Sequence, residues 1–318
     1  MNLSEIFSQE HPMVDGVFIA SDISEHENQI QTNEAFSEKW LKYNNEENEK
    51  QERLFEFQRN WYLKLYGFQS EEELKQYLEK QSVVLDAGCG LGYKAKWFAD
   101  LSPGTLIIGM DYSDAVFAAK QKYTNTENLV FVKGDIADTK IIDGVVSYVS
   151  CDQVLHHTED PQETIYELYR ILCEGGELAV YVYAKKALPR ELLDSYFRKR
   201  TKNISSNEMW KLSEQLTELG KRLSEMRKDF DVPDIPLLGI KGGRMSVQRF
   251  LYWNFIKCFW NANLGWETSV STNYDWYAPS NAERYSQEEF LMMLSNVGLR
   301  QEFIHTEEAC HSGRFVKD

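Results

Sequence analysis

Residues 83–92 read Val83-Val84-Leu85-Asp86-Ala87-Gly88-Cys89-Gly90-Leu91-Gly92. The apolar, β-branched start predicts a buried strand, and the glycines predict a sharp turn into a helix. Glycine lets a ligand approach the backbone without meeting a Cβ atom, and the free N–H groups of a helix N-terminus face such a ligand. The segment therefore predicts a ligand-binding loop between a strand and a helix.

Four apolar runs follow this loop, and amphipathic helices lie between them. We expect strands at 106–111, 129–132, 145–149 and 178–183, and two more near 299–305 and 311–317. The helix before the fifth strand is expected to reach the glycine pair at 175–176. Apolar strands that alternate with helices form a parallel sheet covered on both faces. The sequence thus predicts an α/β protein with a doubly wound, mostly parallel, seven-stranded sheet.

Helical segments precede and interrupt this pattern. An aromatic helix is expected from Asn33 to about Gly67, and its Trp40, Tyr43, Trp61 and Tyr62 would form a lid over the ligand cleft. After the fifth strand we expect a leucine-striped helix at 205–226, a loop, and an aromatic helix near 250–260. The expected parts are the N-terminal extension and lid (1–81), the binding core (82–184), a basic, aromatic helical insertion that covers the substrate (185–285), and a helix with two strands that completes the sheet (286–318).

The residues around the glycines indicate the kind of ligand. Asp86 lies two residues before the first glycine, and Tyr93 stands where a dinucleotide fingerprint would have its third glycine. A carboxylate at that point accepts hydrogen bonds from an ammonium group but sits poorly beside a pyrophosphate. The ligand is therefore expected to be a cationic amino acid derivative rather than NAD.

Residues 83–92 resemble motif I of the class I S-adenosylmethionine-dependent methyltransferases, whose fold is Rossmann-like. Residues 153–157 and 170–178 also resemble small-molecule methyltransferases of the quinone-biosynthesis type, although Glu174 replaces their usual proline. The resemblance covers 82–184 firmly and 286–318 loosely, and it does not extend to the insertion. It implies S-adenosylmethionine as the cofactor, bound at Asp86, Gly88, Cys89, Gly90, Gly92, Asp111, Tyr112, Asp135, Ile136 and Cys151.

Within that resemblance the strand-end acids have separate roles. Asp86 and the glycine-loop backbone would hold the methionine part, and Asp111 would bind both ribose hydroxyls. Asp135 would read the adenine amino group, with Tyr112 against the adenine ring. One carboxylate can span two vicinal hydroxyl donors, which is the physical reason for an acid at the second strand end.

Methyl transfer is an in-line displacement, and a general base helps where the acceptor begins as a hydroxyl or ammonium. Asp152, His156 and His157 follow the fourth strand and are the candidate bases. Arg249, Tyr274, Trp276 and Arg284 are the candidate substrate-binding residues, since arginine can clamp an anion and an aromatic face can pack on a substrate or on the sulfonium.

The charge distribution favours an anionic substrate. The chain has 318 residues and a net charge of −15, but residues 185–257 hold 16 Lys or Arg against 9 Asp or Glu. The acidic remainder argues against nucleic acid as a partner. We therefore expect a methyltransferase for a small, anionic metabolite. A cofactor-binding scaffold without catalysis, or a nicotinamide-dependent oxidoreductase, is the alternative.

Other expectations follow from composition. No apolar run approaches the length of a membrane span, and the first residues lack a signal-peptide pattern, so the protein is expected to be cytoplasmic and not bound to a membrane. The five scattered cysteines predict free thiols and no cysteine-based metal site. The leucine stripe of the insertion could form a homo-oligomer seam.

Overall fold

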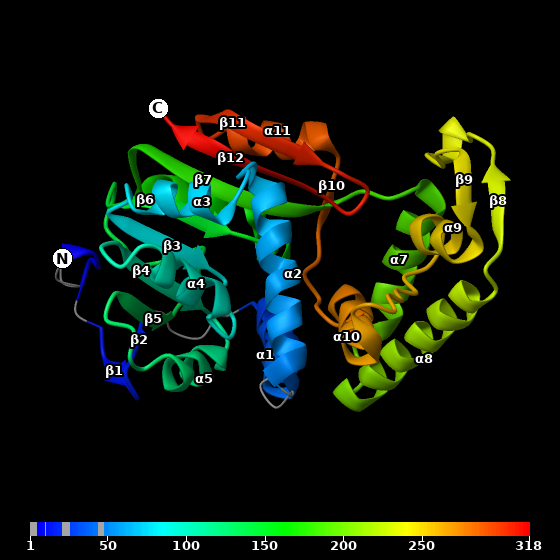
Figure 1. Cartoon of the computed structure of the whole chain (residues 1–318), viewed down its shortest axis with the longest axis horizontal. Coiled ribbons are helices and arrows are strands. Elements are labelled where there is room, and N and C mark those ends of the chain that lie inside the picture. Colours follow the sequence, from blue (N-terminus) through cyan, green and yellow to red (C-terminus); the bar gives the residue numbers. More distant parts are fainter. Residues whose placement is uncertain (1–4, 10, 21–25, 44–47) are drawn as a thin grey trace. The chain divides into compact units, whose positions relative to one another are not determined.

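The computed structural model describes the backbone of residues 5–9, 11–20, 26–43 and 48–318, and the side chains of these residues apart from 43 and 48–53. The chain divides into two compact units (Figure 1). Unit 1 comprises Met1–Tyr183 and Glu283–Asp318, and unit 2 comprises Ala184–Ala282. None of the described helices is both long enough and apolar enough to cross a membrane.

A ten-stranded, mostly parallel sheet forms the centre of unit 1. Its order is β1-β2-β5-β4-β3-β6-β7-β12-β11, and β10 pairs with β7. The strands are β1 (Met13–Val14), β2 (Val17–Ile19), β3 (Val83–Ala87), β4 (Leu106–Asp111), β5 (Leu129–Lys133), β6 (Val146–Cys151), β7 (Leu172–Ala184), β10 (Arg284–Tyr285), β11 (Leu299–Thr306) and β12 (Cys310–Lys317). The strands from β2 to β7 pair in parallel, whereas β1, β11 and β12 are antiparallel to their neighbours.

The α/β class and the mostly parallel sheet are confirmed, but the predicted strand number was too low. All seven expected strands are present, and β1, β2 and β10 add to them. These three strands are two or three residues long, which is too short to produce a readable apolar alternation. The predicted helix end at 174–176 was also wrong, because the helix stops at Ile171 and β7 already begins at Leu172.

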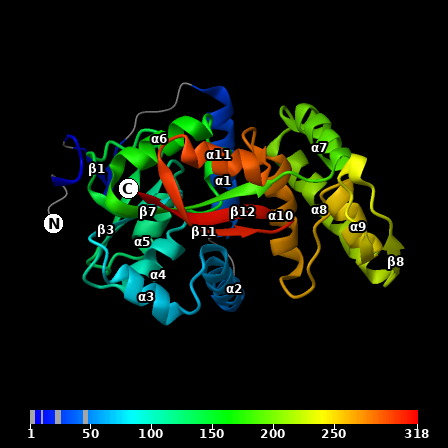
Figure 2. The same ribbon diagram turned by 90° about the horizontal axis from the view of Figure 1, so that it is seen from above.

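Helices cover both faces of the sheet. One apolar cluster joins the strands to α6 (Pro161–Ile171) and α11 (Gln287–Ser295). The other joins the opposite face to α2 (Asn48–Tyr66), α3 (Glu71–Leu78), α4 (Tyr93–Leu101) and α5 (Ala115–Lys122). Figure 2 shows α6 and α11 on one side of the strands and α2, α3 and α4 on the other. This double cover explains why strands β3 and β6 are almost entirely buried.

The N-terminal helices differ in extent from the prediction. The first, α1 (Glu27–Tyr43), begins six residues before the expected start, and α2 ends at Tyr66. The part of the predicted helix at 44–47 and the side chain of Tyr43 lie outside the described residues. Serine side chains cap later helices, with complete capping boxes at Ser205 and Ser286.

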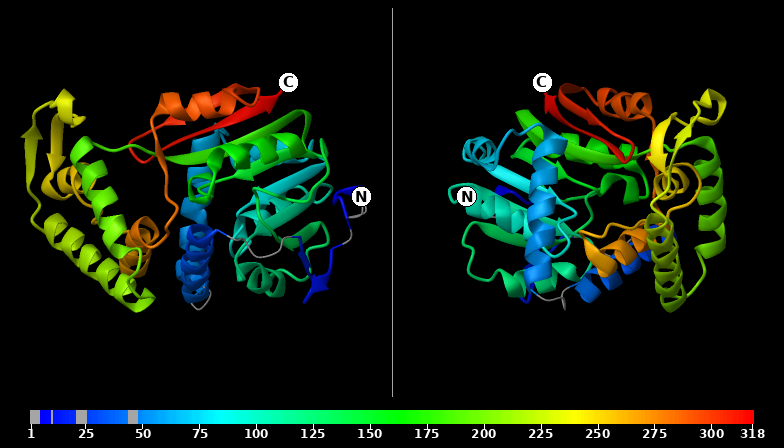
Figure 3. Two further views of the ribbon diagram at one scale, coloured as in Figure 1. Left: turned by 180° about the vertical axis from the view of Figure 1, so that it is seen from behind. Right: turned by 45° about the vertical axis from the view of Figure 1, so that its right-hand side comes forward.

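Unit 2 is mainly helical. It contains α7 (Leu188–Thr201), α8 (Ser206–Glu225), α9 (Val247–Asn254) and α10 (Gly265–Tyr277), with a hairpin of β8 (Asp229–Val232) and β9 (Gly243–Ser246) around a short 3₁₀ turn η3 (Pro236–Leu238). Figure 3 shows this hairpin beside α9. Where a loop was expected between two helices, the chain forms the hairpin.

Two predictions for unit 2 were wrong in detail. The aromatic helix ends at Asn254, so Phe259 and Trp260 lie in an irregular segment. Tyr274 and Trp276 lie in α10, a helix that the sequence did not predict.

Candidate functional site

Acidic residues mark the carboxyl ends of four neighbouring parallel strands. Asp86 lies in β3, Asp111 ends β4, Asp135 follows β5 and Asp152 follows β6. The sheet order β5-β4-β3-β6 places these residues along one edge. Open α/β sheets bind their ligands at this edge. The edge is therefore the candidate site.

The glycine loop is fastened to the neighbouring strand. The N–H groups of Gly88 and Cys89 both donate to the carbonyl of Met110, at 2.8 and 2.9 Å. Gly88 has a φ of 78°, and a Cβ atom there would lie 2.3 Å from Cγ2 of Val154. Only glycine satisfies both requirements, so this position lets the loop pack directly on the segment after β6.

Asp111 closes the loop from the opposite side. Its Oδ2 accepts a hydrogen bond of 2.7 Å from the Gly90 N–H, and its Oδ1 accepts from the Ser113 N–H and hydroxyl at 2.8 and 2.6 Å. Burial raises the pKa of Asp111, and the hydrogen bonds from Ser113 and Gly90 oppose that shift. A carboxylate offers about four acceptor positions, so Asp111 can still accept a ligand hydroxyl.

A buried charge cluster lies beneath the loop. Lys94 Nζ is 3.0 Å from Oδ1 of Asp86 and 3.5 Å from Oδ2 of Asp152. Asp86 is completely buried, and its Oδ2 accepts no hydrogen bond from any residue that the structure describes. Burial acts to lower the pKa of Lys94, but the two carboxylates outweigh it and raise that pKa above its usual value. The cluster therefore holds two carboxylates and one ammonium, with one negative charge left uncompensated.

Sequence reasoning missed Lys94, although a signal was available. Lys94 is the second residue of α4, and the helix dipole disfavours a cation in the first turn. Side chains on a helix point back toward its N-terminus, which directs Lys94 to the strand ends. A lysine at that unfavourable position, together with an acid in β3, indicates a functional ion pair.

Asp152 is bound from α2 as well as from Lys94. The Tyr66 hydroxyl donates to its Oδ1 at 2.8 Å, and the neighbouring Tyr62 hydroxyl donates to the Ser150 hydroxyl at 3.2 Å. Gln153 follows with a φ of 64°, a left-handed conformation that costs energy outside glycine. Such strain concentrates at functional sites, and here it turns the chain sharply at the end of β6.

The two candidate histidines lie in a short 3₁₀ helix, η2 (Leu155–His157). The His156 ring is fully buried, 3.9 Å from the Tyr183 ring and 4.2 Å from the His157 ring, centroid to centroid. The Phe36 and His157 rings pack edge to face, with their centroids 4.8 Å apart. The structure thus brings both histidines to the carboxyl end of β6, close in sequence to Asp152, and encloses them in aromatic side chains.

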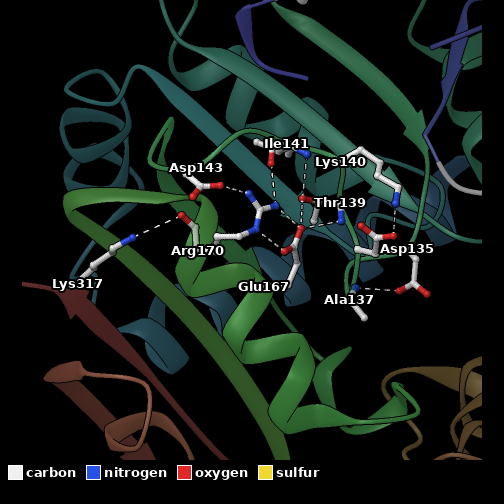
Figure 4. Close-up of polar contacts among 10 residues, drawn as sticks. Asp135, Ala137, Thr139, Lys140, Ile141, Asp143, Glu167, Arg170 and Lys317 are labelled. Carbon is white, nitrogen blue, oxygen red and sulfur yellow. Dashed lines mark hydrogen bonds and ion pairs between the residues drawn. The ribbon is translucent and has the colours of Figure 1, made fainter. Parts of the chain in front are cut away.

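A polar network fixes the segment that carries Asp135. Glu167 accepts from the Thr139 N–H at 2.8 Å, and the Arg170 guanidinium donates to Glu167 and to the Ile141 carbonyl (Figure 4). Oδ1 of Asp135 accepts from the Ala137 N–H at 2.9 Å. Burial raises the pKa of Asp135, opposed by this hydrogen bond. The loop after β5 is therefore held in one conformation.

The remaining predicted cofactor residues also lie along this edge. Tyr112 follows β4 directly and is half-buried, and Ile136 is buried next to Asp135. Cys151 is the last residue of β6, and burial raises the pKa of its thiol to about 12. Burial likewise raises the pKa of Cys89 well above its usual value. Both thiols are neutral near pH 7 and are not nucleophiles.

Aromatic side chains of α1 and α2 contact the glycine loop and its helix. A Cβ atom on Gly90 would lie 2.9 Å from the Trp40 indole, so the ring rests on that glycine. The Phe55 ring stacks on Tyr93 at 4.1 Å with an interplanar angle of 2°. Two other predicted lid residues pack on the strands instead, Trp61 against Tyr181 and Tyr62 against Tyr148.

The four predicted substrate residues are divided between the two units. Arg284 lies in β10 of unit 1, whereas Arg249, Tyr274 and Trp276 lie in unit 2. Tyr274 is buried and stacked on Trp210 at 3.8 Å, which is a packing contact. Arg249 is exposed on α9, and Trp276 is buried among cationic side chains.

Residues 85–180 match the family described as Methyltransferase domain. The matched residues include the glycine loop, the strand-end acids and both histidines. The chain therefore contains a class I S-adenosylmethionine-dependent methyltransferase domain, and the domain's cofactor is S-adenosylmethionine. Unit 2 lies outside the matched residues.

Relatives match over the same part of the chain. The chain is 32% identical over 119 residues (36% of this chain, 44% of the relative) to a Mycolicibacterium smegmatis protein described as a probable S-adenosylmethionine-dependent methyltransferase. It is 24% identical over 127 residues (38% and 54%) to the demethylmenaquinone methyltransferase of Listeria welshimeri. Matches to the first curated relatives span 25–54% of their lengths.

Among solved structures, an S-adenosylmethionine-dependent methyltransferase from Mesorhizobium loti is similar, with a TM-score of 0.46 and 12% identity. The similarity covers 75% of this chain and 92% of that one.

Proposed function

We propose that this chain transfers a methyl group from S-adenosylmethionine to a small, anionic metabolite. The observation that carries the proposal is the buried cluster of Asp86, Lys94 and Asp152 beside the glycine loop. Its uncompensated negative charge and the unpartnered Oδ2 of Asp86 suit the ammonium group of a cationic amino acid.

The residues present fit the cofactor. Asp86 would bind the ammonium of the methionine part, and one N–H of Lys94 beyond its two carboxylate partners would bind the carboxylate. Asp111 would accept the ribose hydroxyls, and Asp135 with Tyr112 would hold the adenine. When bound, the cofactor supplies an electrophilic methyl group on a sulfonium. The chain's own contribution is to hold the acceptor in line with that methyl group and to exclude water.

We propose a lid role for the N-terminal helices. Trp40 on Gly90 and Phe55 on Tyr93 support it, because both contacts place aromatic surface against the loop or the first residue of its helix. Such surface would shield the bound cofactor from water.

A base for the acceptor is proposed among Asp152, His156 and His157. Asp152 already accepts from Tyr66 at 2.8 Å and lies 3.5 Å from Lys94, so other side chains already engage both of its oxygens. A histidine is the better choice, since an unperturbed imidazole titrates near pH 6.5. His157 is slightly exposed whereas His156 is fully enclosed, so His157 is the first of the two to test.

The preference for an anionic acceptor rests on the charge of the insertion, with 16 basic against 9 acidic residues between Lys185 and Lys257. The remaining alternative is a scaffold protein that binds the cofactor but transfers no methyl group. A nicotinamide-dependent oxidoreductase is disfavoured because Asp86 would face a pyrophosphate.

The test is transfer of tritium from methyl-labelled S-adenosylmethionine into a cell extract separated by anion exchange. The expected result is label in a small acidic fraction, with little transfer by His157→Gln and ordinary transfer by His305→Gln, whose histidine lies in β11 and contacts Glu307. Label appearing only in neutral or cationic fractions would contradict the anionic acceptor. Cofactor binding without transfer to any fraction would favour the scaffold.

A further inference from the structure

The segment between α9 and α10 in unit 2 is held firmly in place. A Cβ atom on Gly220 of α8 would lie 2.2 Å from the carbonyl oxygen of Cys258, so the helix touches the segment's backbone. The buried Asn273 side chain accepts from the Phe259 N–H at 2.8 Å and donates to the Phe259 carbonyl at 3.1 Å. Its amide also donates to Thr217 at 2.8 Å. This clamp holds Cys258 and Phe259, and it therefore fixes the position of Lys257, the residue before them.

Lys257 is a buried cation without a carboxylate partner. Its side chain is only 7% exposed, and its Nζ donates to the Tyr252 hydroxyl at 3.1 Å. Among the described residues, no Asp or Glu oxygen lies within 4.0 Å of that nitrogen. The ammonium also stands 4.8 Å from the Trp276 ring centroid. A cation–π contact and one phenol are weak compensation for the loss of water around a charge.

Trp276 is surrounded by further cations. Arg190 lies 5.1 Å from its ring, and Lys186 and Arg198 each lie 5.7 Å from it. Asp194 is the completely buried carboxylate among them, and it is already shared. It accepts from Arg190 at 2.6 Å, from the Trp276 indole at 2.8 Å and from Tyr277 at 2.7 Å. The cluster around Trp276 therefore has more positive than negative charge.

The charge surplus also acts on the pKa of Lys257. The pKa of Lys257 is lowered to about 7, mainly by burial and in part by the neighbouring Arg190. Asp275, Asp194 and Cys258 act in the opposite direction but do not restore it. Tyr252 and Trp276 complete the surroundings and are neutral near pH 7. An anion next to Lys257 would favour its charged form and so bind together with a proton.

We propose that unit 2 contains a binding site for an oxyanion, a carboxylate or phosphate-type group, at Lys257 and Lys186 beside Trp276. Both ammonium groups stand over that indole, and Lys186 is half-buried and also lies 5.4 Å from Trp253. The anion would supply the partner that Lys257 lacks. Assigning the anion to the methyl acceptor rests on the proposed methyl transfer, whereas anion binding by unit 2 does not.

The test follows the protonation of lysine side chains by NMR in the full chain, labelled with ¹³C at lysine Cε. Sulfate and acetate are the probes, because neither changes charge between about pH 6 and pH 9. Sodium chloride at equal ionic strength is the reference. The expected result is one lysine signal with a midpoint near pH 7, present in the wild type and in Lys199→Gln but missing in Lys257→Gln. Lys199 is exposed on α7 and serves as the matched control.

Saturating anion should raise that midpoint by about one pH unit, which corresponds to roughly tenfold tighter binding to the charged lysine. A shift with sulfate indicates a phosphate-type group, and a shift with acetate alone indicates a carboxylate. A midpoint that neither anion moves beyond the chloride reference would overturn the proposal, and so would a Lys257 signal that titrates at the ordinary lysine value. The wild-type measurement needs no variant, so it stands even where Lys257→Gln fails to fold. Failure of methyl transfer would leave this result unchanged, which separates the two proposals.

Discussion

Replacing Lys94 with methionine should destabilise unit 1 strongly. The substitution keeps the length of the side chain but removes the ammonium that lies 3.0 Å from the buried Asp86. Removing one partner of a buried ion pair costs about 3–5 kcal/mol, because the remaining charge stays desolvated. For a domain of this size such a loss lowers the thermal midpoint by roughly 6–20 °C.

The loss should depend on pH. Burial raises the pKa of Asp86 above 3.8, and without Lys94 nothing close by opposes that shift. The folded variant then keeps a proton on Asp86 that the unfolded chain releases. Its stability therefore falls as pH rises above the usual aspartate pKa, by at most about 1.4 kcal/mol per pH unit, until the raised pKa is passed. The deficit is smallest near pH 4 to 5 and largest near pH 8.

The assay is thermal unfolding followed by circular dichroism at several pH values. Lys96→Met is the matched control, because Lys96 lies on the same helix and pairs with the exposed Asp100 at 2.5 Å. That variant should lose less than about 1 kcal/mol. Adding Asp86→Asn to Lys94→Met should recover much of the lost stability. Equal midpoints for the Lys94 and Lys96 variants, or a deficit that does not change with pH, would refute the reasoning.

Three further predictions concern single positions. Asp111→Ala should weaken S-adenosylmethionine binding roughly 10- to 100-fold in calorimetry, because it removes one charged hydrogen bond. Unchanged affinity would exclude Asp111 from the site. Gly90→Ala, at a φ of 52° and against Trp40, should cost about 1–2 kcal/mol and change the tryptophan emission; a variant as stable as the wild type would mean that the ring does not rest there. Asn273→Ala should speed hydrogen exchange across 255–264, because it leaves the partners of Asn273 unpaired, at about 1–3 kcal/mol for each group. Unchanged exchange would argue against the clamp.

The sheet core was largely predictable, because strands buried on both faces are continuous apolar runs. The expected run at 106–111 coincides with β4, and the two C-terminal strands lie within a residue of their expected bounds. The added strands were not predictable. The two-residue strand β10 forms only through its pairing with β7, and nothing in Arg284-Tyr285 encodes that pairing.

The site was predictable where a residue's place follows from a strand end. Asp86, Asp111, Asp135 and Asp152 lie along one edge for that reason. Lys94 was missed because its role depends on distance in space, since the two acids it joins come from different strands. The same holds for Lys257, whose neighbours Arg190 and Trp276 lie 67 and 19 residues away in sequence. Local pattern does not encode such clusters.

The measurement that tests the central claim most directly is isothermal titration calorimetry of the full chain with S-adenosylmethionine and S-adenosylhomocysteine, with NADH as the control. The strand-end site predicts binding of the first two ligands and none of NADH. Absence of heat with both S-adenosyl ligands, or binding of NADH instead, would contradict the assignment of this edge as the cofactor site.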